Sequence, residues 1–86
     1  MLISLNSVDK VVNFVNAVSR FDEELELKSG MHVVDAKSIM GVFCLDLTEP
    51  IELVTDHIKS EMLLKILNDF KWQKVDKYLM KESMVS

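Results

Sequence analysis

The sequence contains few of the residues that break or cross-link a chain. Its 86 residues include two glycines, one proline and one cysteine. Because glycine and proline supply many turn conformations, their scarcity predicts loops that are few and short. The lone Cys44 excludes an internal disulfide and fits a reducing compartment, so the expected location is the cytoplasm.

Long apolar runs and an excess of basic residues are also missing. The apolar start, residues 1–5, is too short for the core of a signal peptide or for a membrane span. Ten Lys and Arg residues against fourteen Asp and Glu residues give a net charge of −4. Phosphate contacts need clustered basic side chains, so neither nucleic acid nor a membrane is an expected partner.

The remaining composition is that of one folded domain. Hydrophobic residues make up 49% of the chain and charged residues 28%, a balance typical of globular proteins. We expect a single domain over residues 1–86, with one modest core. The last dozen residues are expected to form a helical extension or a tail.

The spacing of apolar residues predicts the elements. Residues 39–45 fit a strand or a helix by periodicity alone, and Ser38 as an N-cap favours a short helix. Ser29 and Gly30 form a hairpin-type turn signal between two predicted strands. The predicted strands are 1–5, 24–28, 32–35 and 51–54, and the predicted helices are 8–19, 39–45 and 59–70.

This order, β-α-β-β-α-β-α, predicts an α+β fold of the open-faced β-sandwich type. In such a fold, helices cover one face of a four-stranded antiparallel sheet.

One segment resembles a known family. Residues 35–42 read Asp-Ala-Lys-Ser-Ile-Met-Gly-Val, which resembles the regulatory-serine motif of Gram-positive HPr proteins, the histidine-containing phosphocarriers of the bacterial sugar phosphotransferase system. Residues 18–22, Val-Ser-Arg-Phe-Asp, resemble the end of that family's first helix, and the spacing between the two segments agrees without gaps. The resemblance covers most of residues 6–70 and implies the HPr-like form of the predicted fold.

The resemblance also implies that the carrier site has been lost. In HPr, a histidine at the start of the first helix takes phosphate from enzyme I and passes it to enzymes IIA. Here Ser7 stands at the histidine position and Asp9 at the position of the neighbouring arginine. A phosphoserine ester releases its phosphate far less readily than a phosphohistidine, and Asp9 would repel the incoming group. No catalytic residue is therefore expected.

The regulatory site is retained. In the relatives, the serine that matches Ser38 is phosphorylated by HPr kinase/phosphorylase, and the product binds the catabolite control protein. Lys37, Ile39, Met40 and Val42 resemble the partner-binding residues beside that serine. The resemblance thus implies a non-catalytic regulatory protein, phosphorylated at Ser38, that acts by protein–protein contact in carbon regulation as a monomer or weak homodimer.

Other interpretations of the same residues stay open. Ser38 also suits a plain helix cap, as does Ser7. His57 is a candidate acceptor for a working phosphocarrier that uses enzyme I and enzymes IIA, whereas an ordinary surface histidine is the commoner role. A structural or dimerising relic of the family is a third interpretation.

Two further expectations concern metals and Cys44. His32 and His57 lie far apart in sequence, with no i,i+4 pair, so neither a metal site nor a cofactor is expected. Cys44 lies in an apolar run and is expected to be a small buried hydrophobe.

Overall fold

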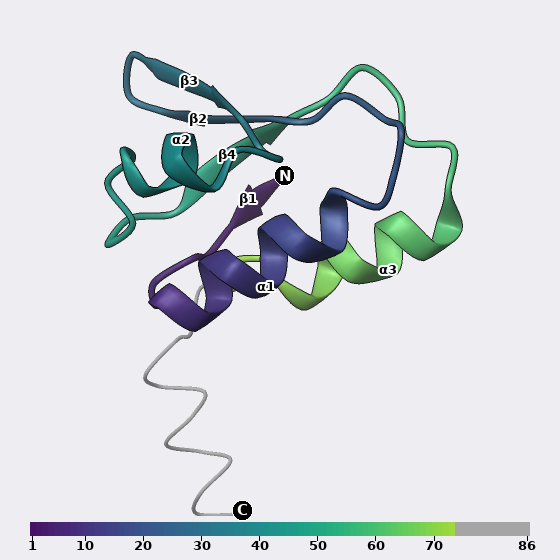
Figure 1. Ribbon diagram of the computed structural model, residues 1–86, viewed down its shortest axis with the longest axis horizontal. Helices are drawn as coiled ribbons and strands as arrows, with labels where there is room; N and C mark the ends of the chain where they lie inside the picture. The colour runs from purple at the N-terminus through teal and green to yellow at the C-terminus, as the bar shows by residue number, and fades with distance from the viewer. Residues whose placement is uncertain (74–86) are drawn as a thin grey trace, which may run out of the picture.

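The computed structural model describes residues 1–73 of the chain (Figure 1). It contains four strands and three helices in the predicted order. The strands are β1 (Leu2–Ile3), β2 (Glu26–Ser29), β3 (His32–Asp35) and β4 (Ile51–Val54), and the helices are α1 (Val8–Val18), α2 (Ile39–Phe43) and α3 (Glu61–Asp69). Residues 39–43 are therefore helical, as the Ser38 cap favoured.

The strands form one antiparallel sheet in the order β1-β4-β2-β3. Burial alternates along them: Leu27, Ile51 and Leu53 are buried, whereas Lys28 and Glu52 are exposed. One face therefore points to the core beneath the helices, and the other face is open. This arrangement confirms the predicted α+β fold with helices on a four-stranded antiparallel sheet (Figure 1).

Each helix begins at a serine whose hydroxyl accepts a hydrogen bond from the backbone three residues later. Ser7 accepts from Lys10 N–H at 3.1 Å, and Ser60 accepts from Leu63 N–H at 3.2 Å. Ser38 has the same role in α2. These caps satisfy backbone donors that the first helical turn leaves unpaired, and so they fix where each helix starts.

The core lies between the sheet and the helices α1 and α3. Phe14 of α1 is fully buried and meets Phe70 edge-to-face, with ring centroids 5.2 Å apart. Leu63 and Leu67 bring the apolar side of α3 into the same core. Because α1 and α3 supply this packing, both helices are held by tertiary contacts rather than by local propensity alone.

The outer edge of β1 is covered by the backbone that follows α3. Ser4 N–H donates to the Phe70 carbonyl and Trp72 N–H donates to the Leu2 carbonyl, both at 2.8 Å. The first strand, predicted over 1–5, is regular only over Leu2–Ile3, but it is paired with β4 on one side and with residues 70–72 on the other. Within residues 1–73, no helix is long and apolar enough to cross a membrane.

Several element boundaries differ from the prediction, most of them by one or two residues. The second strand begins at Glu26 rather than at residue 24 and continues to Ser29, which shifts the tight turn to Gly30 and Met31. The expected helical extension or tail after residue 73 lies outside the described residues.

Candidate functional site

Ser38 lies at the surface where β3 leads into α2. Its hydroxyl oxygen accepts a hydrogen bond from Gly41 N–H at 3.2 Å, and its own N–H donates to the Asp35 carbonyl at 3.0 Å. A Cβ at residue 41 would lie 3.3 Å from both the Ser38 hydroxyl oxygen and the Val34 Cβ. Glycine at position 41 thus lets α2 pack closely on β3 while Ser38 stays exposed.

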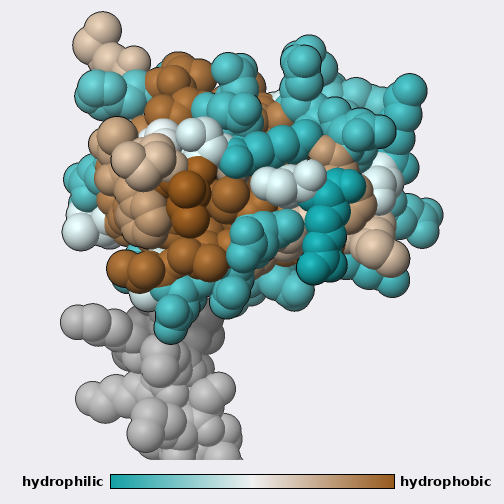
Figure 2. All heavy atoms as spheres, viewed as in Figure 1, coloured by the Kyte–Doolittle hydropathy of each residue, from teal (hydrophilic) through white to brown (hydrophobic). Residues whose placement is uncertain are grey.

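Apolar side chains are exposed on α2, the helix that Ser38 caps, and at the start of α1. Met40 is 76% exposed, Phe43 40% and Ile39 37%, and Val8 at the start of α1 is 65% exposed. We call these four residues the α2 patch. Figure 2 shows apolar side chains gathered over α2 and the start of α1, on the left of the view. Exposed apolar groups that gather in this way are typical of a contact surface for another protein.

The prediction that Val42 belongs to the partner-binding surface is wrong, because its side chain has no exposed area and packs in the core. Phe43 is exposed in its place, and the prediction missed it. A five-residue helix has too few turns for sequence periodicity to show which side faces the core. The signal for Phe43 in the sequence is its spacing. It follows Met40 by three residues and Ile39 by four, which places all three on one side of a helix.

Lys37 is half-buried and forms part of the framework of this region. Its ammonium group donates a hydrogen bond to the Phe21 carbonyl, and its backbone N–H donates to the Asp35 carboxylate at 2.9 Å. The first of these bonds ties the segment before Ser38 to the connection that follows α1, and the second is local to that segment. Because its ammonium group is bonded to the Phe21 carbonyl, the Lys37 side chain is held against the protein.

The start of α1 shares a surface groove with the end of α2. The groove is lined by Asn6, Ser7, Val8, Phe43, Leu47 and Thr48. Ser7 acts as the helix cap, as expected, and Asp9 is exposed in the first turn of α1. The structure therefore brings Ser7 and the α2 patch onto one side of the molecule.

His57 lies elsewhere. It is exposed in the connection between β4 and α3, which Figure 1 places on the opposite side of the molecule from α2 and the start of α1. His32 is exposed at the start of β3. Among the described residues, no hydrogen bond joins either histidine to Ser38 or to Ser7.

Cys44 is exposed at the end of α2, so the expectation that it is buried is wrong. It follows the last helical residue, and its N–H donates to carbonyls of the final turn. Val42 and Leu45 take the core positions on either side of it. Because the chain turns at the end of α2, Cys44 points outward.

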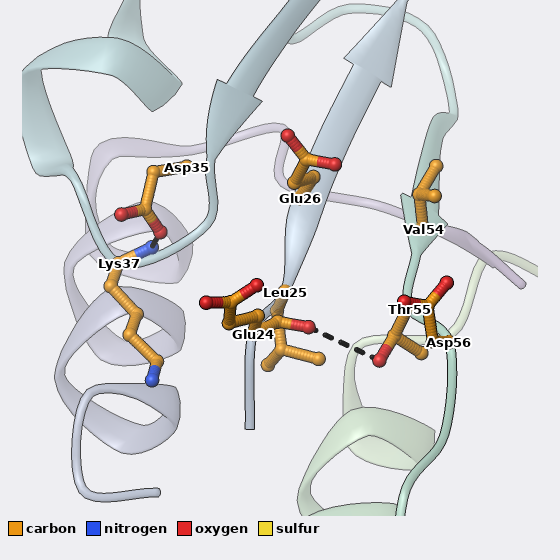
Figure 3. A pocket seen from close by; sticks show the side chains of 8 residues that line it. All are labelled: Glu24, Leu25, Glu26, Asp35, Lys37, Val54, Thr55 and Asp56. Atoms are coloured by element: carbon orange, nitrogen blue, oxygen red, sulfur yellow. Dashed lines mark hydrogen bonds between the residues drawn. The ribbon is translucent and has the colours of Figure 1, made fainter. Parts of the chain in front are cut away.

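A hollow of about 280 Å³ lies at one end of the sheet (Figure 3). It is lined by Glu24, Leu25, Glu26, Asp35, Lys37, Val54, Thr55 and Asp56. Thr55 Oγ1 donates to the Glu24 carbonyl at 3.2 Å, which joins the segments after β4 and before β2. Across residues 1–73, no group of three or more His, Cys, Asp or Glu side chains is arranged to hold a metal ion.

Comparison of this chain with family models, with curated proteins and with solved structures finds no match. The resemblance to HPr proteins therefore stays a prediction from the motif, and the function is argued from the site.

Proposed function

We propose that this chain is an HPr-like, non-catalytic regulatory protein of the cytoplasm that is phosphorylated at Ser38 and acts by protein–protein contact. The observation that carries the proposal is the exposed Ser38 hydroxyl beside the exposed side chains of Ile39, Met40 and Phe43. A kinase reaches this hydroxyl from solvent. A partner that contacts the α2 patch then meets the added phosphate at the rim of the same surface.

Phosphorylation at this position adds about −1.5 to −2 charges at neutral pH. Ser38 precedes the first residue of α2, so the phosphate oxygens stay close to the Gly41 N–H that the hydroxyl already engages. The α2 patch itself carries no charged side chain. The modification therefore changes the charge beside an apolar contact surface without placing charge inside it.

The loss of carrier chemistry belongs to the same proposal. The Ser7 hydroxyl accepts the Lys10 N–H and caps α1, and Asp9 adds negative charge where an incoming phosphate would approach. The partners proposed from the resemblance are an HPr kinase/phosphorylase and a regulator like the catabolite control protein.

Intact mass after incubation with HPr kinase and ATP tests the proposal. We expect one acid-stable phosphate on the protein, absent in Ser38→Ala and retained in Ser60→Ala, a matched cap serine on α3. Phosphorylation should then strengthen binding to the catabolite control protein, and Met40→Lys should weaken that binding. A protein that gains no phosphate at Ser38 contradicts the proposal.

The alternative is a working phosphocarrier that uses exposed His57 with enzyme I and enzymes IIA. It requires an acid-labile phosphate after treatment with phosphoenolpyruvate and enzyme I, lost in His57→Gln. Because the connection that contains His57 lies on the opposite side of the molecule from α2 and the start of α1, this carrier would use a separate surface. The same mass measurement, before and after mild acid, separates the two functions.

A further inference from the structure

The two edges of the sheet differ. The edge at β1 is covered by residues 70–72. Within residues 1–73, β3 at the other edge pairs only with β2 (Figure 1). The segment 31–35 also contains no lysine or proline, the residues that commonly block pairing of an edge strand with another chain.

The turn before β3 determines which of its backbone groups point outward. Ser29 and His32 are paired across a two-residue turn, and Gly30 has φ 60 while no other described residue has positive φ. This pattern matches a type II′ hairpin turn, whose flanking residues form a close hydrogen-bonded pair. The N–H and C=O of His32 therefore point toward β2.

The alternation of an antiparallel ladder then assigns the rest of β3. Val34 points its N–H and C=O toward β2, like His32, whereas Val33 and Asp35 point theirs toward the open edge. The Asp35 carbonyl already accepts the Ser38 N–H. Val33 is thus the strand residue with both its donor and its acceptor on the open edge.

The same alternation can be checked at β4. Carried across β2, it places the N–H of Leu53 on the side of β4 that faces β1. Leu53 N–H donates to the Met1 carbonyl at 2.8 Å, in agreement.

We propose that two copies of this chain associate by antiparallel pairing of their β3 strands, centred on Val33. In this register each Val33 donates to and accepts from its copy, and each Asp35 N–H faces a Met31 carbonyl. Centring on Val34 fails because its N–H and C=O serve β2. Centring on Asp35 fails because two carboxylates would face each other and the Asp35 carbonyl is engaged.

The side chains favour a second copy as the occupant. Val33 is 51% exposed and Met31 98%, so the pairing covers apolar surface next to the new hydrogen bonds. The facing pairs are Val33 with Val33, Met31 with Asp35, and His32 with Val34, and none of them opposes like charges. In this register β3 is therefore complementary to a second copy of itself in both its backbone hydrogen bonds and its side chains.

The pairing is weak, because the strand has four residues and the contact is short. The net charge of −4 on each copy opposes association, so added salt should promote it. This inference does not depend on modification of Ser38.

Sedimentation of the full chain from about 10 μM to about 1 mM protein tests the proposal, over the concentrations expected for a weak contact. We expect a monomer at the low end and a growing dimer fraction at the high end. Val33→Lys places like charges face to face and should weaken the dimer at least tenfold, on the order expected for a buried repulsion. The matched control is Val54→Lys, at an exposed position on the same open face of the sheet but on a central strand.

Amide hydrogen exchange supplies a readout on the unmodified protein. At high concentration the Val33 amide should exchange more slowly than at low concentration, whereas the Val34 amide, bonded to β2, should not change. A chain that stays monomeric throughout the range overturns the proposal. So does a dimer that Val33→Lys leaves intact, which would mean that another surface or residues 74–86 make the contact.

Discussion

Asp46 stabilises the chain just after α2 through Thr48. Its carboxylate accepts hydrogen bonds from the Thr48 N–H, at 3.1 Å, and from the Thr48 hydroxyl. These two bonds lower the pKa of Asp46 below the ordinary value of 3.8, and the bond from the hydroxyl has the larger effect. Because the folded-state pKa is depressed, the stability that these bonds give is present above the ordinary value and is lost as the pH falls through the lower one.

Replacement of Thr48 by valine removes the hydroxyl and leaves the backbone donor. We therefore expect Thr48→Val to raise the pKa of Asp46 toward 3.8, as measured by a carbon NMR titration of its carboxyl group. Thr55→Val, which removes a hydroxyl bonded to the Glu24 carbonyl, is the control and should leave Asp46 unchanged. An Asp46 pKa that is the same in Thr48→Val and in the parent would contradict this assignment.

At this scale the sequence predicted caps better than burial. Ser7 and Ser38 are the caps that their positions indicated, because a serine before an apolar run has few other local roles. Val42 and Cys44 were each assigned to the wrong environment. Their exposure depends on how α2 sits on β3, which is a tertiary contact that the local pattern does not encode.

At the scale of elements, α3 illustrates how a cap and a core face combine. Its nine residues are too few to be stable alone, so the Ser60 cap and the buried Leu63 and Leu67 hold it in place. We expect Ser60→Ala to lower the free energy of unfolding by about 1 kcal/mol. Urea denaturation followed by circular dichroism measures it.

Ser60→Asp is the informative comparison for that cap. A carboxylate accepts the Leu63 N–H and also suits the positive end of the helix, so this variant should keep most of the stability. If Ser60→Asp is destabilised as much as Ser60→Ala, the hydrogen bond to Leu63 is not what holds the start of α3.

The long helices were predictable from their period, within limits. The pattern predicted the ends of the first helix within one residue, and Phe14 is the largest buried side chain of α1. Val8 and Met62 are apolar residues in the first turns of α1 and α3, yet both are exposed. Residues in the first turn of a helix often project past the sheet, so period alone overestimates the length of the buried side.

At the scale of the whole molecule, the sequence predicted the order of elements but not the order of strands. Nothing local indicates that β1 lies beside β4, or that residues 70–72 cover its outer edge. These pairings join segments some fifty to seventy residues apart in sequence. Distant partners of this kind are chosen by the packing of the entire core, which a pattern read along the chain does not contain.

Trp72→Pro tests how much the covered edge matters. It removes the N–H that donates to the Leu2 carbonyl, so this edge should open more often. The Ser4 amide, which bonds to the Phe70 carbonyl, should then exchange about tenfold faster, as expected for the loss of one hydrogen bond. The Ala36 amide, bonded to Leu25 far from this edge, is the internal control. Equal Ser4 exchange in both proteins would show that the edge is held by other contacts.

The position of β1 between two distant partners also constrains how the protein is made. Leu2, Ile3 and Leu5 leave the ribosome before both of their partners, because β4 begins at Ile51 and the covering segment reaches Trp72. During translation the backbone of β1 therefore lacks both of its pairing partners until nearly all of residues 1–73 have been synthesised. The sheet therefore closes late in the synthesis of residues 1–73, and β1 is the strand that a nascent-chain binding factor can reach for the longest time.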